Sequence, residues 1–142
     1  MQVKPTEFNG VLYRSRTEAR WAMFLTVMGI HFTYEAEAFA LGDGTIYHLP
    51  DFWLIDQDRF LEIKGELATP EEWHKCAMLS IDSGKEVLLA IGSPDGSDQI
   101  LRFPDEMRLH EGTHFSAREV FGECYAAIQT VLGHRFYEPS RL

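Results

Sequence analysis

The stretch that decides the fold is LPDFWLIDQDRFLEIKG, residues 49–65. Two apolar segments in it flank a short polar turn, which is typical of a β-hairpin. A loop of two or four residues, centred between Asp56 and Gln57, places Asp51 directly opposite Glu62 on the neighbouring strand. The stretch therefore predicts two carboxylates on one face of a sheet.

Lys64 follows Glu62 by two residues and should face the same side, because side chains alternate along a strand. A three-residue loop would bring Ile63 opposite Asp51 instead, so the arrangement depends on the register. Two carboxylates at about 5 Å repel each other, which is costly on an apolar sheet. Mg²⁺ binds one or two carboxylates together with water and phosphate oxygens. The stretch thus predicts a Mg²⁺ or Mn²⁺ site beside a lysine that orients water or stabilises charge.

The flanking patterns predict an α/β fold. The expected order is α-β-β-β-α-β, followed by one more strand and one more helix, which gives a mixed sheet with helices on both faces. Capping motifs and glycines bound the helices, and apolar runs mark the strands. The expected helices run from Ser15 to Gly29, from Thr69 to about Ser83 and from Ser116 to Gly133; the expected strands are 31–41, 45–55, 59–64, 86–91 and 99–103, with a short turn or strand at 8–13.

Glu18 is a fourth candidate site residue. Its helical phase points it towards the sheet, although its spacing from Ser15 also fits a capping box, in which a glutamate only reaches back to a backbone amide. Arg14, Arg16 and Arg20 surround it and form the basic cluster of the chain. Phosphate contact is one use for these arginines, and a solvated helix face is the other.

The overall charge restricts how the chain could bind nucleic acid. Its 142 residues suit a single domain, with 45% hydrophobic and 25% charged residues and a net charge of −9. Residues 1–30 carry net +2, residues 31–66 net −6 and residues 67–142 net −5. A protein that holds nucleic acid by nonspecific phosphate neutralisation should be basic. Any nucleic-acid role therefore needs a local basic patch, a metal ion or a partner.

Cysteine usage and hydropathy predict a cytoplasmic protein. Cys76 and Cys124 are too far apart in sequence for a cysteine-based zinc motif and are expected to be buried free thiols. No apolar run approaches the ~20 residues that span a bilayer. Residues 1–10 lack the layout of a signal peptide.

At this point the chain resembles the PD-(D/E)XK nuclease superfamily. Pro50-Asp51 matches the first half of the motif, Glu62-Ile63-Lys64 matches the second, and the helix start from Arg14 to Trp21 is similar to phage and transposon members. The resemblance covers about residues 10–92 of a single domain 1–142, with 93–142 as an extension. It implies a metal-dependent DNA endonuclease in which Asp51, Glu62 and the Ile63 carbonyl bind Mg²⁺ or Mn²⁺, Glu18 is an accessory ligand, and Lys64 activates water or stabilises charge.

The expected partners follow from this resemblance. Duplex or branched DNA is the expected substrate, contacted by Arg14, Arg16, Arg20 and, on the second helix, Lys75. A homodimer or a partner subunit would suit cleavage of both strands, with the last helix as a docking face. The alternative is a catalytically idle nuclease-like module that contacts a protein, and a nuclease directed at RNA is a third reading.

Three other ionisable side chains precede the motif in the sequence. His48 should face away from Asp51 in a regular strand, so packing is the favoured role. Glu35 and Glu37 share one strand face and could reach the cation, but a solvated face is the default expectation.

Overall fold

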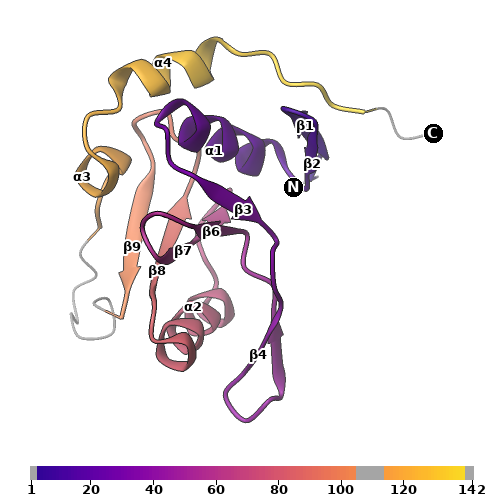
Figure 1. The fold of residues 1–142 in the computed structure, drawn as a ribbon, viewed down its shortest axis with the longest axis vertical. Coiled ribbons are helices and arrows are strands. Elements are labelled where there is room, and N and C mark those ends of the chain that lie inside the picture. Colours follow the sequence, from indigo (N-terminus) through magenta and orange to yellow (C-terminus); the bar gives the residue numbers. More distant parts are fainter. Residues whose placement is uncertain (1–2, 105–113, 140–142) are drawn as a thin grey trace.

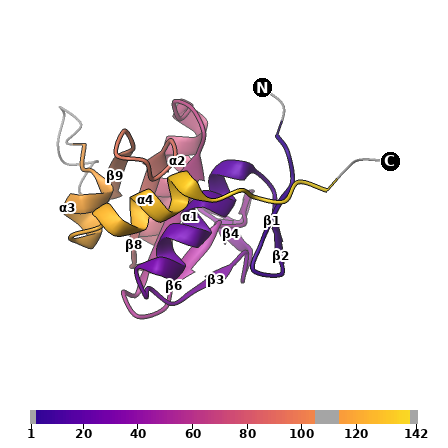
Figure 2. The same cartoon turned by 90° about the horizontal axis from the view of Figure 1, so that it is seen from above.

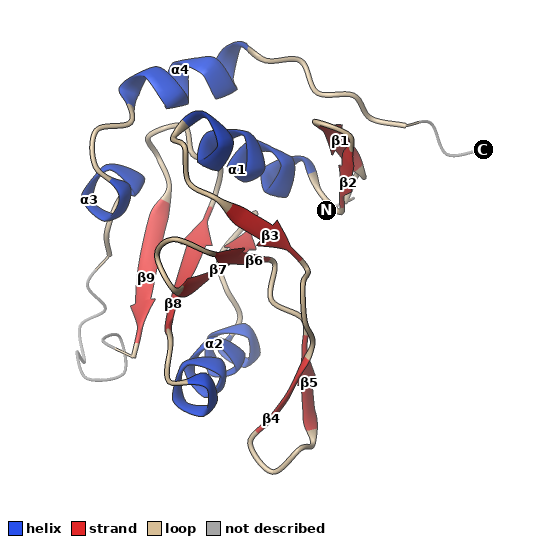
Figure 3. Ribbon diagram, in the orientation of Figure 1, coloured by secondary structure: helices blue, strands red, loops and turns tan. Residues whose placement is uncertain are grey.

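The computed structural model describes residues 3–104 and 114–139 (Figure 1). Its central sheet has the strand order β3-β6-β7-β8-β9, in which β7 and β8 are parallel and the other neighbours antiparallel. Two hairpins, β1-β2 and β4-β5, are separate from this sheet (Figure 3). The strands are β1 Thr6–Phe8, β2 Val11–Tyr13, β3 Phe32–Tyr34, β4 Phe39–Leu41, β5 Ile46–His48, β6 Phe52–Leu54, β7 Arg59–Lys64, β8 Glu86–Ile91 and β9 Gln99–Phe103; the helices are α1 Arg16–Val27, α2 Pro70–Ser83, α3 Ala117–Phe121 and α4 Tyr125–Gly133.

Helices cover both faces of the central sheet. In Figure 1, α1 and α4 lie on one face and α2 on the other, and the view from above in Figure 2 shows α4 running beside α1. Alternation along β7 explains the two cores, because Leu61 and Ile63 pack with Trp21 of α1, whereas Phe60 packs with Leu79 of α2. The predicted α/β class, with a mixed sheet between helices, is confirmed.

The register of β6 and β7 is the one that the sequence predicts for a four-residue loop. Phe52 pairs with Leu61, and the loop closes with the amide of Asp58 donating to the carbonyl of Leu54 at 2.9 Å. Continuing this register by one residue places Asp51 opposite Glu62. The pair of carboxylates therefore shares one face of the sheet, as expected.

Helix α1 is held over the carboxyl ends of β7 and β8. Ser15 caps its N-terminus by accepting a hydrogen bond from the amide of Glu18 at 3.1 Å. Trp21 is fully buried, and its indole donates to the carbonyl of Gly92 at 2.8 Å, directly after β8. These contacts fix the first turns of α1 near the end of β7, where the motif residues lie.

Helix α2 begins with a complete capping box and ends at a left-handed glycine. The Thr69 hydroxyl accepts from the amide of Glu72, and the Glu72 carboxylate accepts from the amide of Thr69. Gly84 then ends the helix with φ 69°, a conformation in which glycine has no side-chain clash. The predicted bounds of this helix are confirmed.

Removing the cap should weaken the fold measurably. Thr69→Ala leaves an α2 amide without its side-chain acceptor, so we expect the free energy of unfolding to fall by about 1 kcal/mol. Urea unfolding followed by circular dichroism measures the change. Thr69→Ser keeps the hydroxyl and should stay close to the original protein; equal losses in both variants would contradict the role of the cap.

Two segments expected as single strands are each divided. The segment 31–41 forms β3 and β4, because Glu35 adopts a left-handed backbone with φ 48° that interrupts the extended chain. The segment 45–55 forms β5 and β6, with Pro50 between them, which has no amide to donate. Strands β4 and β5 pair only with each other, and their hairpin leaves the plane of the central sheet.

The last predicted helix is also divided, and the first turn is more regular than expected. Gly122, with φ 89°, separates α3 from α4. Residues 8–13 belong to the β1-β2 hairpin, whose turn residues Asn9 and Gly10 both have positive φ. This pair is the favoured sequence for a two-residue hairpin turn.

Two expectations about thiols and membranes can be compared with the structure. Cys76 and Cys124 are both free and buried, as predicted. Within residues 3–104 and 114–139, none of the helices combines the length and the apolar character needed to cross a membrane.

Candidate functional site

Two hydrogen bonds tie Asp51 to the end of β7, one to Glu62 and one to Ile63. The amide of Asp51 donates to Glu62 Oε1 at 2.8 Å, and the amide of Ile63 donates to Asp51 Oδ2 at 2.8 Å. Glu62 is 2% exposed. The antiparallel register explains the arrangement, because it brings the start of β6 against the end of β7.

Glu18 lies close to this pair, on the first turn of α1. Its carboxylate accepts hydrogen bonds from the Tyr34 hydroxyl at 2.7 Å and from the Ser15 hydroxyl at 3.0 Å. Its side chain is buried. The carboxylate thus binds two side-chain hydroxyls, whereas a capping box would bring it back to the backbone amide of the cap residue.

Burial and neighbouring charges raise the pKa of two of these carboxylates, Asp51 and Glu18. Burial, followed by the charges of Glu62 and Glu18, raises the pKa of Asp51 well above its usual value. Burial is also the main cause that raises the pKa of Glu18, against the opposing effect of its two hydroxyl donors. The Lys64 charge opposes this effect at Asp51, and a cation bound between the carboxylates would further favour their ionised forms.

Lys64 is the cation nearest to these carboxylates in sequence. Its ammonium contacts Glu72 Oε2 at 2.6 Å, so the capping-box glutamate of α2 also holds the lysine. Burial alone would lower the pKa of Lys64, but the bond to Glu72 and the charges of Glu72, Asp51 and Glu62 raise it overall. Lys64 is therefore protonated at neutral pH and suited to stabilising negative charge.

One cleft brings most of the predicted site residues together. It has a volume of about 550 Å³, and Glu18, Asp51, Ile63 and Lys64 all line it. Glu62, which is buried, is not among the lining residues. Besides Lys64, the basic residues of the cleft are Lys4, Arg14, Arg16 and Arg20.

The three predicted arginines already have partners within the chain. Arg14 forms an ion pair with Glu35, and Arg16 forms one with Glu138. The Arg20 guanidinium donates to the hydroxyl of Ser93 at 3.2 Å. A bound phosphate would therefore compete with two carboxylates for the first two arginines.

Lys75 lies elsewhere. It is on α2, 3.9 Å from Glu71, and it does not line the cleft.

His48 corrects one sequence expectation. Its Nε2 atom lies 3.3 Å from Glu62 Oε1, so the side chain points towards the site and not away from it. In the described part of the chain this nitrogen has no hydrogen-bond partner. The expectation failed because residues 45–55 are not one regular strand, and the break around Pro50 resets the alternation.

The default expectation for Glu35 and Glu37 is a solvated strand face; Glu37 is exposed as expected, whereas Glu35 is half-buried. The amide of Glu35 donates to the carbonyl of Asp51 at 2.8 Å, while its carboxylate pairs with Arg14. Glu37 lines a different pocket. The left-handed backbone at Glu35 interrupts the strand, so the two side chains do not follow regular strand alternation. No sequence pattern predicts this interruption.

The site offers a divalent cation few protein ligands. Among the described residues, no group of three His, Cys, Asp or Glu side chains is arranged to hold a metal ion. Asp51 and Glu62 each use one oxygen for a backbone amide and keep the other. The Ile63 carbonyl points to the same side of β7 as its amide, which is towards Asp51. Two carboxylate oxygens, a carbonyl and water fit Mg²⁺, which needs few protein ligands.

Comparison with known proteins adds no family. The chain matches no family model, no curated protein and no solved structure.

Proposed function

We propose that the protein is a Mg²⁺- or Mn²⁺-dependent nuclease of the PD-(D/E)XK type that hydrolyses DNA phosphodiester bonds. The observation that carries this proposal is the juxtaposition of Asp51, Glu18 and Lys64 in one cleft, with Glu62 hydrogen-bonded to the amide of Asp51. The cleft is also lined by Lys4, Arg14, Arg16 and Arg20. The resemblance of Pro50-Asp51 and Glu62-Ile63-Lys64 to the superfamily motif supports it, and so does the predicted register of the two strands.

Each residue would have a separate task. Asp51, Glu62 and the Ile63 carbonyl would hold the cation, with Glu18 as an accessory ligand. A bound divalent cation acidifies water and polarises a phosphoryl oxygen. Lys64, kept protonated by Glu72, would stabilise the negative charge that develops on the phosphate.

The substrate would be held by a local patch and not by the whole surface. Arg14, Arg16, Arg20 and Lys4 concentrate positive charge at the cleft, while the chain as a whole carries −9. Such a patch can bind a few phosphates close to the scissile bond. We therefore propose duplex or branched DNA, with a homodimer or partner subunit supplying the remaining affinity.

Digestion of four DNA forms tests the proposal. Supercoiled, linear, single-stranded and four-way-junction DNA are incubated with Mg²⁺, with Mn²⁺ and with a chelator, beside a matching RNA. We expect cleavage of DNA that the chelator abolishes. Cleavage of RNA alone would shift the substrate class, and chelator-resistant cleavage would contradict the proposed chemistry.

The ion pair between Arg16 and Glu138 gives a prediction about DNA affinity. Glu138→Gln should release Arg16 and strengthen binding of a DNA duplex about two- to fivefold, since exposed ion pairs are worth at most about 1 kcal/mol. Fluorescence anisotropy with a chelator present measures binding without cleavage. Glu123→Gln is the matched control, because it removes the same charge and releases Arg118 on α3. Equal gains in both variants would show a general charge effect.

A second candidate function is a binding module with a nuclease-like fold. The hydrogen bonds of Asp51 and Glu62 to backbone amides favour it, because they stabilise both carboxylates without a metal ion. Calorimetry separates the two candidates. A nuclease should bind Mn²⁺ in a way that Asp51→Asn abolishes, whereas a binding module should show no such dependence.

A further inference from the structure

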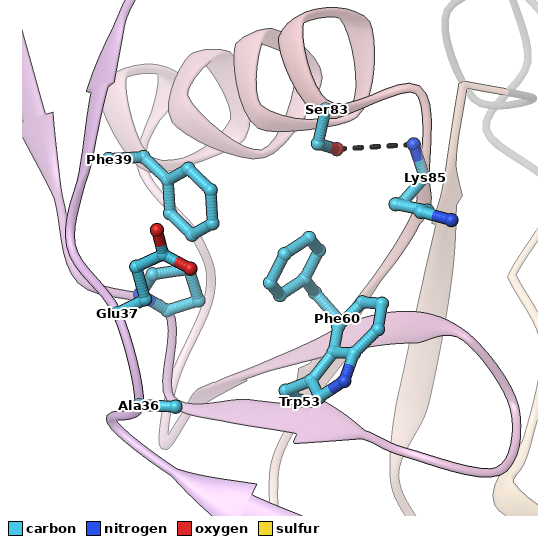
Figure 4. A pocket seen from close by; sticks show the side chains of 8 residues that line it. Ala36, Glu37, Phe39, Trp53, Phe60, Ser83 and Lys85 are labelled. Carbon is cyan, nitrogen blue, oxygen red and sulfur yellow. Dashed lines mark hydrogen bonds between the residues drawn. The ribbon is translucent and has the colours of Figure 1, made fainter.

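A second hollow, the aromatic pocket, lies on the α2 side of the sheet. It has a volume of about 350 Å³, and its walls include Phe39, Pro50, Trp53 and Phe60, with Glu37 and Lys85 as charged lining residues. Figure 4 shows the three rings, which come from β4, β6 and β7, turned towards one shared space. Pockets of this size with a few polar groups are typical of small-ligand sites.

The rings offer flat surfaces at different angles. The Trp53 and Phe60 ring centroids are 4.7 Å apart, and Phe39 meets Phe60 edge-on at 5.6 Å and 87°. Trp53 and Phe39 are only half-buried, so their faces are not fully used within the chain. An added planar ring could stack here.

The aromatic pocket and the cleft of the candidate active site are lined by consecutive residues. Pro50 lines the pocket and Asp51, the next residue, lines the cleft. Trp53 pairs with Phe60 in the ladder, two residues along from Asp51 and Glu62 and on the same face of the sheet. Two residues of strand span about 6.6 Å, a separation that a nucleotide or two can bridge.

From this neighbourhood we propose that the aromatic pocket binds the nucleobase of a nucleotide flanking the scissile phosphate, stacked against Trp53. This inference rests on the proposed nuclease function. Stacking on aromatic rings tolerates any base. The Glu37 carboxylate can accept from an exocyclic amino group, and the Lys85 ammonium, now paired with Asp58 at 2.7 Å, can contact a neighbouring phosphate.

An abasic scan tests the proposal. Duplex and four-way-junction oligonucleotides carry one abasic residue at successive positions around the cleavage site, and kcat/KM is measured with Mn²⁺. The original protein should lose about tenfold at one flanking position. Trp53→Leu should lose a similar factor on the intact oligonucleotide and show no further loss at that position. Tyr47→Leu removes an exposed ring outside the pocket and should keep the original pattern.

A second measurement covers the case in which Trp53→Leu fails to fold. In the Lys64→Ala protein, binding of the intact oligonucleotide should quench tryptophan emission. The oligonucleotide that is abasic at the flanking position should quench less, since Trp21 and Trp73 respond equally to both.

The outcomes distinguish failure of the proposed nuclease function from failure of the inference about the aromatic pocket. No cleavage of the intact oligonucleotide by the original protein would overturn the proposed function and this inference with it. Cleavage with no position-dependent penalty, or with the same penalty in Trp53→Leu, would overturn the inference alone. The latter is also the result expected if an aromatic side chain of a protein partner occupies the pocket.

Discussion

Lys64→Ala should reduce metal-dependent DNA cleavage by roughly 10²- to 10⁴-fold, the range seen when a group that stabilises charge or transfers protons is removed. Lys64 lines the cleft with Asp51, and its ammonium is fixed by Glu72. The loss should appear in kcat with little change in DNA binding, since several arginines remain. Single-turnover cleavage with enzyme in excess measures the chemical step.

Matched variants show whether that loss is specific. Lys75→Ala also removes one lysine charge, but Lys75 lies on α2 outside the cleft. This variant should therefore cleave at nearly the original rate. Glu62→Ala should abolish cleavage, and its thermal unfolding shows whether the fold survives. Retained metal-dependent cleavage in both Lys64→Ala and Glu62→Ala would show that the site is wrongly assigned.

The features that the sequence predicted correctly depend on regular patterns among residues close together in the chain. The register of β6 and β7 follows from a four-residue turn and from strand alternation, so the approach of Asp51 to Glu62 could be predicted. The bounds of α2 follow from its capping box and from Gly84. These features involve neighbours within about a dozen residues, for which pattern and propensity are informative.

The contacts that complete the site join residues on different elements of the fold. Tyr34 reaches Glu18, Glu72 reaches Lys64, and Glu138 reaches Arg16 across 122 residues. No local sequence motif identifies which residues form these pairs. They result from packing of α1, α2 and the C-terminal segment around the sheet, and a single sequence carries no signal for such pairings.

Irregular backbone accounts for the expectations that failed. His48 was placed on the wrong side because alternation was carried through Pro50, and Glu35 was placed beside Glu37 because its left-handed φ of 48° was not foreseen. A non-glycine residue in that conformation is uncommon and is held by its surroundings. Here the amide of Glu35 donates to the carbonyl of Asp51, so the irregularity also orients the candidate ligand.

The second large effect concerns stability and its dependence on pH and metal. Because the folded-state pKa of Asp51 lies above the unfolded value, the folded state holds this proton more tightly. The free energy of unfolding should therefore fall as pH rises from the unfolded pKa through the folded pKa. Asp51→Asn removes the buried charge and can still accept from the amide of Ile63. Without metal at pH 7 we expect the variant to be more stable by roughly 1–3 kcal/mol.

Metal should offset that difference. A cation that binds only the folded state at a hundred times its Kd adds about 2.7 kcal/mol, and the original protein should gain this with Mn²⁺ while Asp51→Asn does not. Urea unfolding at pH 4 and pH 7, with Mn²⁺ and with a chelator, measures all four conditions; the difference between the proteins should shrink at pH 4. Asp58→Asn, on the surface beside Lys85, is the control. Equal stabilisation of the original protein and of Asp51→Asn by Mn²⁺ would exclude Asp51 as a ligand. A cation bound by the Asp51 carboxylate should stabilise the original protein more than a variant that lacks this carboxylate.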